Sequence, residues 1–221
     1  MITQRLGRPC YVENDANAAA YGELLAGAGV GCKDMIAVTL GTGVGGGIII
    51  DGKVYHGYNF YGAELGHVVI VFDGEPCTCG RRGCWEAYAS ATALIRQTKA
   101  AMEAHPDSVM WEKAETLDKV SGRTAFDAMR AGDAAGKAVV NRYIEYVACG
   151  LIDLVNSFQP EIICMGGGIC NEGETLMAPL RKLIERDRYS RYAEKQTKLV
   201  TAKLGNDAGL IGAAMLGRLI G

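Results

Sequence analysis

The sequence has no excess of basic residues, no long apolar run and only three histidines among its 221 residues. Its 23 lysines and arginines are balanced by 25 aspartates and glutamates, so the charge gives no support for nucleic-acid binding. No apolar run reaches the ~18 residues of a membrane span, and the amino-terminal segment MITQRLGRPC lacks the apolar core of a signal peptide. We therefore expect a cytoplasmic protein with neither a membrane nor a nucleic-acid partner for this segment.

A disulfide framework is also missing, although the chain has eight cysteines. Three of them cluster between residues 77 and 84, and the other five are scattered among apolar or glycine-rich segments: Cys10, Cys32, Cys149, Cys164 and Cys170. An odd number of dispersed cysteines is typical of reduced, mostly buried thiols. Apolar residues make up 49% of the chain, which suffices for one large domain or two small ones.

The cysteine cluster has the spacing of a metal site. Cys77, Cys79 and Cys84 form C-x-C-x4-C, interrupted by glycines, and His67 lies ten residues upstream of the first cysteine, across an apolar run at 68–72 that we expect to be a strand. Three thiolates and one imidazole suit a tetrahedral zinc ion, and four protein ligands make such a site structural. The alternative is a set of free thiols beside an ordinary core histidine.

Two glutamates flank this cluster. Glu64 stands three residues before His67 in a glycine-flanked turn, and Glu86 opens a helix directly after the last cysteine. Carboxylates and an imidazole that are held by a metal from behind suit a ligand rich in hydroxyls, such as a sugar. Taken alone, the two glutamates would be interpreted as surface residues, and the cysteine cluster between them favours the binding role instead.

A second acidic position lies near the start of the chain. Asn14 and Asp15 stand between an expected short strand at 8–12 and an expected helix at 16–26. Both are good residues for the beginning of a helix, which is the simpler interpretation. The other is that Asp15, at a helix amino terminus, accepts a proton from a substrate hydroxyl.

Two glycine turns follow predicted strands. The first, at 41–47, comes after a strand at 35–40 and before a hairpin with an Asp-Gly turn. The second, at 166–168, comes after a strand at 162–165. Backbone N–H groups in such turns can bind phosphate, with Thr42 adding a hydroxyl, although glycine turns without a ligand are common. No Gly-Lys-Ser/Thr follows, so this is not a Walker motif.

The remaining segments predict mainly packing elements. We expect helices at 85–104, 134–158 and 174–188, a last strand at 199–203, and a final helix at 208–220 that follows Asn206 and Asp207. Asp133 is expected to cap the longest helix, whose apolar positions repeat at helical spacing. We expect the glycines of the final helix to permit close packing. His105 is expected at the surface, and the sequence suggests no partner for His56.

Together these motifs resemble the ROK family of sugar kinases and sugar-responsive repressors. The family's signature is an E-x-G-H turn followed by C-x-C-G-x-x-G-C-x-E, and here G-A-E-L-G-H precedes C-T-C-G-R-R-G-C-W-E. The segments V-E-N-D-A-N-A-A-A, L-G-T-G-V-G-G-G and N-D-A-G-L-I-G-A-A also fit the family. The resemblance therefore covers essentially the whole chain.

The resemblance implies an α/β fold of the actin-like ATPase (hexokinase/RNase H-like) type, mainly its second lobe, with a zinc knuckle. It divides the chain into a remnant of the first lobe at 1–26, the second lobe at 27–205, and a carboxyl-terminal helix at 206–221 that packs back towards the first lobe. Family members also suggest a homodimer. The D-x-G-G-T hairpin that opens kinases of this fold is absent, so we expect a truncated chain that lacks about 100 residues and is inactive alone.

The resemblance also assigns roles. Asp15 would be the catalytic base, and the sugar would be bound by Asn14, Glu64, His67 and Glu86. ATP with Mg²⁺ would be bound by Gly41, Thr42, Gly43, Gly45, Gly166, Gly167 and Gly168. Zinc would be bound by His67, Cys77, Cys79 and Cys84.

The implied activity is phosphorylation of a hexose by ATP, with glucose converted to glucose 6-phosphate. N-acetylmannosamine and fructose are alternative substrates. A sugar-sensing repressor that carries an amino-terminal helix-turn-helix is the alternative from another class.

Overall fold

A mixed five-stranded sheet forms the centre of the computed structural model, which describes residues 2–217. The strand order is β3-β2-β1-β4-β5, with β2 antiparallel to β1 and to β3, and β4 parallel to β1 and to β5. The strands are β1 (Met35–Leu40), β2 (Val44–Ile50), β3 (Lys53–Val54), β4 (Ile162–Gly166) and β5 (Lys198–Thr201). Because the two central strands are parallel, their carboxyl ends meet at one edge of the sheet.

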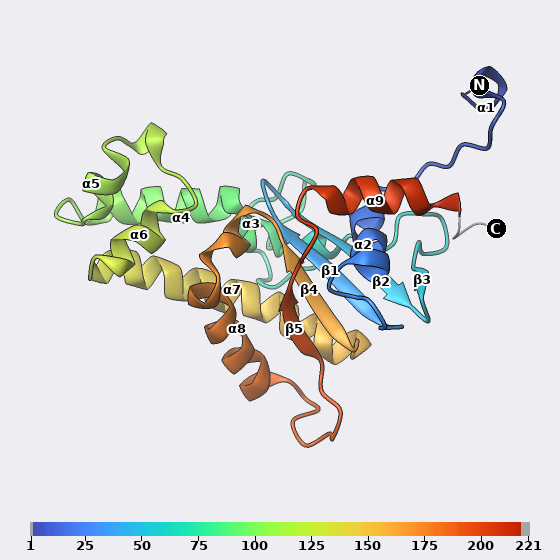
Figure 1. The fold of residues 1–221 in the computed structure, drawn as a ribbon. Coiled ribbons are helices and arrows are strands. Elements are labelled where there is room, and N and C mark those ends of the chain that lie inside the picture. Colours follow the sequence, from blue (N-terminus) through green and yellow to red (C-terminus); the bar gives the residue numbers. More distant parts are fainter. Residues whose placement is uncertain (1, 218–221) are drawn as a thin grey trace.

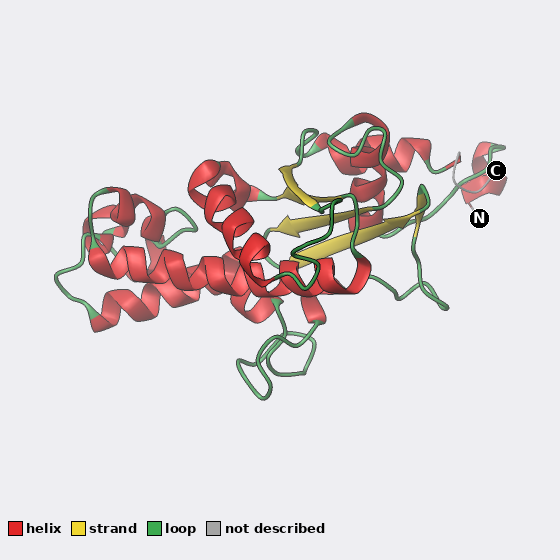
Figure 2. Ribbon diagram, turned by 90° about the horizontal axis from the view of Figure 1, so that it is seen from below, coloured by secondary structure: helices red, strands yellow, loops and turns green. Residues whose placement is uncertain are grey.

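The helices lie on both faces of this sheet (Figures 1 and 2). On one face, α2 (Asp15–Ala26) packs against α9 (Asp207–Met215). On the other lie α7 (Ala134–Phe158) and α8 (Glu174–Asp187). The side chains of β1 alternate between the two resulting cores: Ile36 belongs to the α7 side and Met35 to the α2 side. This accounts for the nearly continuous apolar sequence of β1, since both of its faces are covered.

A helical extension projects from one end of the sheet (Figure 1). It contains α4 (Ala91–Ala104), α5 (Met110–Ala114), α6 (Thr124–Arg130) and the short helix η2 (Leu117–Lys119). At the opposite end, α1 (Ile2–Leu6) stands away from the rest of the molecule. The remaining short helices are η1 (Leu65–His67), α3 (Glu86–Ala89) and η3 (Gly168–Glu172). None of the helices within residues 2–217 is long and apolar enough to cross a membrane.

Several predicted elements are confirmed. The strand at 35–40 and the helix after Asp133 have the expected bounds, and the Asp133 carboxylate accepts a hydrogen bond from the Gly136 N–H at 2.7 Å. The hairpin turn has the positive φ angles of a type I′ turn, 49° at Asp51 and 74° at Gly52. The α/β architecture of the actin-like type is therefore present.

Four expectations about elements were wrong. Residues 8–12 form no strand: Val12 is 91% exposed and lies beside none of the described strands. The run at 68–72 forms only an isolated bridge, between Val69 and Cys84, because its chain turns into the cysteine loop. The first glycine turn is shorter than predicted, since β2 already begins at Val44. The helix at 85–104 is broken at Ser90, whose hydroxyl accepts the Ala93 N–H and caps α4.

The end of the chain differs in part as well. In α9, Gly212 packs closely on α2: an added Cβ would lie 1.7 Å from the Ala18 carbonyl oxygen. A Cβ added at Gly209 would meet no atom within 4 Å, so this glycine does not serve the packing. Asn206 makes no side-chain capping bond. The predicted extension of this helix to residue 220 lies partly outside the described residues.

Candidate active site and metal centre

The two glycine turns lie side by side. Thr39 of β1 is opposite Gly166 of β4 in the parallel register, so the turns that follow these strands leave the same edge of the sheet. In open α/β sheets, ligands bind at the carboxyl ends of the strands. Gly167 has a φ of 94°, and an added Cβ there would lie 2.3 Å from the Leu40 carbonyl oxygen. Only glycine fits this close approach of the two turns.

Two cavities adjoin along this edge. The first, of about 440 Å³, is lined by Asp15, by Glu86 and by the turn from Gly41 to Gly45. The second, also about 440 Å³, is lined by the turn at 166–168 together with Asn171 and Asn206. Ala19 and Thr39 contribute to both walls, so the cavities are neighbours. Asp15 and Glu86 line the first cavity, and Glu23 is the acidic residue that lines the second.

Asn14 and Asp15 have different structural roles at the start of α2. The Asn14 side-chain oxygen accepts the N–H groups of Ala16 and Asn17 at 2.9 and 3.2 Å, so Asn14 caps the helix as the simpler interpretation predicted. Asp15 is the first residue of the helix and lines the first cavity. Its carboxylate accepts the Ala16 N–H at 2.9 Å at the amino terminus of α2, where the helix dipole favours negative charge.

The four predicted metal ligands come together. The ligand atoms of His67, Cys77, Cys79 and Cys84 all lie within 4.8 Å of one another. His67 Nδ1 is 3.6 Å from the Cys77 sulfur, and the Cys79 and Cys84 sulfurs are 3.7 Å apart. These separations match the edges of a tetrahedron around one ion with Zn–S and Zn–N bonds of about 2.0–2.3 Å. The donor set therefore fits zinc, with the Nε2 atom of His67 facing away from it.

Glycine and tryptophan shape the loop around this cluster. Gly83 has a φ of 79°, and an added Cβ would lie 1.7 Å from the Val71 carbonyl oxygen. Trp85, directly after the last cysteine, is 1% exposed and donates from Nε1 to the Tyr146 carbonyl of α7 at 2.9 Å. The cysteine loop is thus fixed to the long helix beneath it.

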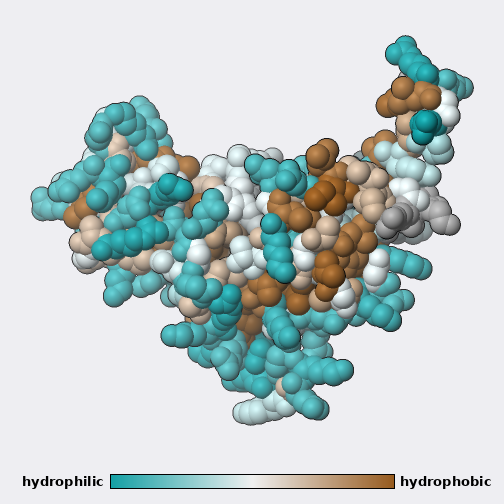
Figure 3. Space-filling view, in the orientation of Figure 1, coloured by the Kyte–Doolittle hydropathy of each residue, from teal (hydrophilic) through white to brown (hydrophobic). Residues whose placement is uncertain are grey.

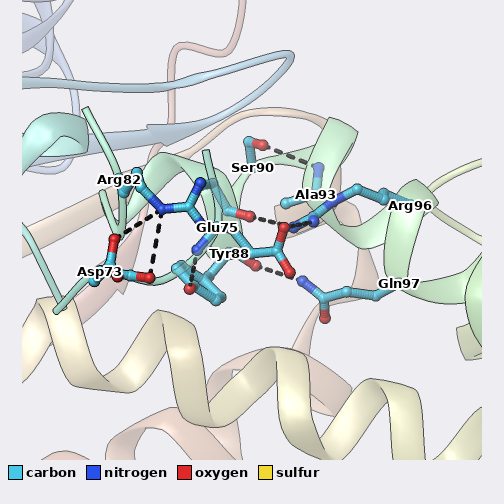
Figure 4. Close-up of polar contacts among 9 residues, drawn as sticks. Asp73, Glu75, Arg82, Tyr88, Ser90, Ala93, Arg96 and Gln97 are labelled. Atoms are coloured by element: carbon cyan, nitrogen blue, oxygen red, sulfur yellow. Dashed lines mark hydrogen bonds and ion pairs between the residues drawn. The ribbon is translucent and has the colours of Figure 1, made fainter. Parts of the chain in front are cut away.

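Side chains of α3 and α4 hold the other side of the loop (Figure 4). The Tyr88 hydroxyl accepts the Glu75 N–H at 2.7 Å, and Arg96 pairs with the Glu75 carboxylate. Arg96 also donates to the Ala87 carbonyl at 2.7 Å, and Gln97 to the Tyr88 carbonyl at 2.9 Å. This network was not predicted, because single polar residues at these spacings form no recognisable motif.

Glu86 connects the cysteine loop with the first glycine turn. Its Oε2 accepts the Val44 N–H at 3.1 Å, and its Oε1 accepts the Thr78 hydroxyl at 3.1 Å. Glu64 is exposed at the start of η1, and its carboxylate accepts no hydrogen bond from the described residues. The structure therefore brings Glu86 into the cavity wall with Asp15 and leaves the Glu64 carboxylate unengaged.

His56 has a partner that the sequence did not suggest. Its Nε2 atom is 2.6 Å from Oε2 of Glu13, the residue that precedes Asn14. Burial alone would raise the pKa of Glu13, but hydrogen bonds from Asn17 and His56 outweigh that effect and lower it. In the sequence, the position of Glu13 next to Asn14 and Asp15 was the only feature that could have pointed to this contact.

A sheet of this order, with glycine turns on parallel strands and an acidic helix terminus opposite them, defines one lobe of an actin-like ATPase. A family model described as the ROK family matches residues 1–219, and the chain belongs to the ROK family.

The relatives include sugar kinases and regulators. The chain is 40% identical to a glucokinase of Streptomyces coelicolor, over 98% of this chain and 69% of that protein. A crystal structure of a ROK family glucokinase from Streptomyces griseus in complex with glucose and AMPPNP has a TM-score of 0.86 at 41% identity, covering 98% of this chain and 70% of that one. The xylose repressor of Bacillus subtilis is 30% identical, over 97% of this chain and 52% of that protein. The chain thus spans about two thirds of the length of these glucokinases.

Proposed function

We propose that this chain carries the sugar site and the phosphate-binding turns of an ATP-dependent hexose kinase, with glucose as the substrate and glucose 6-phosphate as the product. The observation that carries the proposal is the position of Asp15, which lines one cavity with the first glycine turn and Glu86. A base, a phosphate-binding turn and a hydroxyl-binding carboxylate in one cavity are what phosphoryl transfer to a sugar requires. The 40% identity to a glucokinase supports glucose in particular.

In the proposed reaction, Asp15 accepts the proton of the sugar's 6-hydroxyl group. The sugar oxygen then attacks the γ-phosphorus of ATP in line, and the bond to the leaving ADP oxygen breaks. The N–H groups of Thr42 and Gly43 would face the phosphates, because those of Gly41 and Val44 donate to the Gly43 carbonyl and to Glu86. The turn at 166–168 would lie against the adenosine. Mg²⁺, when bound, would neutralise phosphate charge.

Sugar hydroxyls would be bound by Asn14, Glu64, His67 and Glu86. Support comes from the free Glu64 carboxylate and from the ring of His67, whose Nδ1 atom lies in the thiol cluster while Nε2 is left for a ligand. Zinc, held by His67 and the three cysteines, would be structural and would fix the orientation of that ring.

A sugar-sensing repressor is the second candidate, favoured by the 30% identity to a xylose repressor. Kinases for N-acetylmannosamine or fructose would use the same cavity. A repressor needs sugar binding but no base, so the effect of removing Asp15 on turnover separates the classes.

Glucose-dependent release of ADP from ATP and Mg²⁺ tests the proposal. We expect no turnover from this chain alone, and turnover once it is joined to the first lobe of a ROK glucokinase. In that joined protein Asp15→Asn should lower turnover at least ~100-fold, since general-base catalysis contributes about 10²–10⁴-fold. Asp118→Asn, the same chemical change at an exposed position on η2, serves as the matched control. Turnover that Asp15→Asn leaves unchanged would overturn the proposed role of Asp15. Glucose binding without any turnover in the joined protein would favour the sensor.

A further inference from the structure

His56 and Glu13 form a pair that joins two separate parts of the sugar site. The pair lies outside the zinc cluster and the glycine turns, and the two residues are 43 positions apart in the sequence. The Glu13 side chain is 10% exposed and that of His56 30%, so water competes only partly for their contact. Because an ionised carboxylate only accepts hydrogen bonds, His56 Nε2 is the donor.

We propose that His56 is a positioning residue, which fixes the segment before α2 against the turn that carries Glu64. The importance of this positioning for catalysis rests on the proposed kinase function. The contact between His56 and Glu13 does not depend on that function.

On the side of α2, the Glu13 carboxylate has three partners. Besides His56, its Oε1 accepts the Asn14 N–H at 3.0 Å and the Asn17 side-chain amide at 2.9 Å. Glu13 therefore ties His56 to the backbone of Asn14 and to the first turn of the helix that begins with Asp15. Loss of the His56 contact would leave a mostly buried carboxylate with fewer partners, and this is costly.

On the other side, His56 begins the loop that leads to Glu64. The His56 carbonyl accepts the Gly62 N–H at 2.9 Å, which closes the loop, and its ring lies 5.6 Å from the ring of Phe60. Phe60 and Ala63 both have a φ of 65°, a left-handed conformation that non-glycine residues adopt only when surrounding contacts hold them. Since Ala63 directly precedes Glu64, this loop conformation sets where the Glu64 side chain begins.

The test compares four single variants and one double variant of the full chain. His56→Ala removes the contact, His56→Gln keeps an N–H donor, Glu13→Gln removes the charge of the acceptor, and Tyr58→Ala alters a fully exposed side chain in the same loop. Hydrogen–deuterium exchange is measured for peptides that cover residues 13–18 and, as a check on global stability, residues 35–40 of β1. Glucose affinity is measured by calorimetry on the same proteins.

We expect exchange in the 13–18 peptide to rise about tenfold in His56→Ala, to return towards the wild-type rate in His56→Gln, and to stay unchanged in Tyr58→Ala. The exchange rate of the β1 peptide should stay the same in all variants. Glucose affinity should fall about tenfold in His56→Ala and recover in His56→Gln. The double variant Glu13→Gln/His56→Ala should bind glucose no more weakly than the more affected of the two single variants. The reason is that both substitutions disrupt the same His56–Glu13 interaction.

Unchanged exchange at 13–18 in His56→Ala, or an equal rise in Tyr58→Ala, would overturn the positioning role. A wild-type chain that binds no glucose would instead contradict the proposed function, and the exchange rates would still decide whether His56 fixes the segment. Altered exchange together with unaltered glucose affinity would also overturn the proposal, because the contact would then serve stability alone.

Discussion

Glu86 contacts both the metal cluster and the wall of the cavity of Asp15. One carboxylate oxygen lies 3.8 Å from the Cys77 sulfur, and the other accepts the N–H of Val44, the first residue of β2. A change at the cysteines is therefore expected to move a wall of the cavity, although no cysteine needs to touch a substrate. At the scale of residues, we propose that zinc bound by this cluster supports sugar binding through Glu86.

Cys79→Ser is expected to abolish stoichiometric zinc binding, to lower the unfolding temperature by several degrees and to weaken glucose binding. The reason is that three ligands hold structural zinc poorly and that its binding energy contributes directly to folding. Metal content by mass spectrometry and thermal unfolding measure this. Cys10→Ser, a change at an exposed thiol far along the chain from the cluster, should leave both unchanged. Full zinc content in Cys79→Ser would contradict the assignment of this ligand.

The clustering of His67 with the three cysteines could be predicted because the spacing of these residues is a local pattern, with glycines where the loop needs positive φ. The Glu13–His56 pair could not be predicted, since two lone ionisable residues 43 positions apart carry no periodicity or motif. Glu86 was predicted for the cavity, but its contact to the Val44 N–H depends on where β2 begins, which sequence boundaries do not fix.

At the scale of elements, the cap of α7 should make stability depend on pH. Burial alone would raise the pKa of Asp133, but hydrogen bonds from the Gly136 N–H and the Ser108 hydroxyl outweigh it, and the pKa lies below its usual value. A carboxyl whose pKa is lowered by folding stabilises the protein fully above its unfolded pKa, and this contribution is lost as the pH falls through the folded value.

Asp133→Ala is therefore expected to reduce the free energy of unfolding by about 1 kcal/mol at pH 7. The difference from the wild type should shrink as the pH falls below about 4, the unfolded pKa of an aspartate. Urea unfolding at several pH values measures it, with the exposed Asp118→Ala as the control. A difference that stays constant down to pH 3 would contradict an ionised cap.

The packing of the cysteine loop on α7 gives a second test at this scale. An added Cβ at Gly150, in the middle of α7, would lie 2.2 Å from the Trp85 ring. Gly150→Ala should cost about 1–3 kcal/mol by overpacking, although alanine is the better helix former. Gly209→Ala in α9, where an added Cβ meets nothing within 4 Å, should be neutral or stabilising. Equal effects of the two changes in chemical denaturation would contradict this account of the loop.

The elements that were predicted well are those with a strong local signal. The buried strand at 35–40, the Asp-Gly hairpin and the capped helix after Asp133 belong to this group. The prediction of a strand at 68–72 failed because tertiary structure decides the conformation of this apolar run. The cysteine loop offers it a single bridge partner and no extended strand to pair with. The helix break at Ser90 was missed because serine caps a helix only where the chain already turns.

At the scale of the whole molecule, apolar side chains gather on the face that carries α9 (Figure 3). Leu210 of α9 is 73% exposed, and the chain spans 69% of the length of the Streptomyces coelicolor glucokinase. We propose that residues 1–26 and 206–221 belong with a first lobe, which would cover this face, and that residues 27–205 form the second lobe. The proposed homodimer rests on the family resemblance, and sedimentation velocity would test it by measuring the oligomeric state in solution.

The central claim of this account is that the cavity of Asp15, Glu86 and the first glycine turn binds a hexose. Calorimetric titration of the zinc-loaded chain with glucose tests it most directly, with Glu86→Gln as the variant and Glu112→Gln, the same change on the exposed face of α5, as its control. We expect the wild type and the control to bind glucose and Glu86→Gln to bind it at least about tenfold more weakly, as for a lost charge-assisted hydrogen bond. Absence of binding, or binding that Glu86→Gln leaves unchanged, would contradict the account.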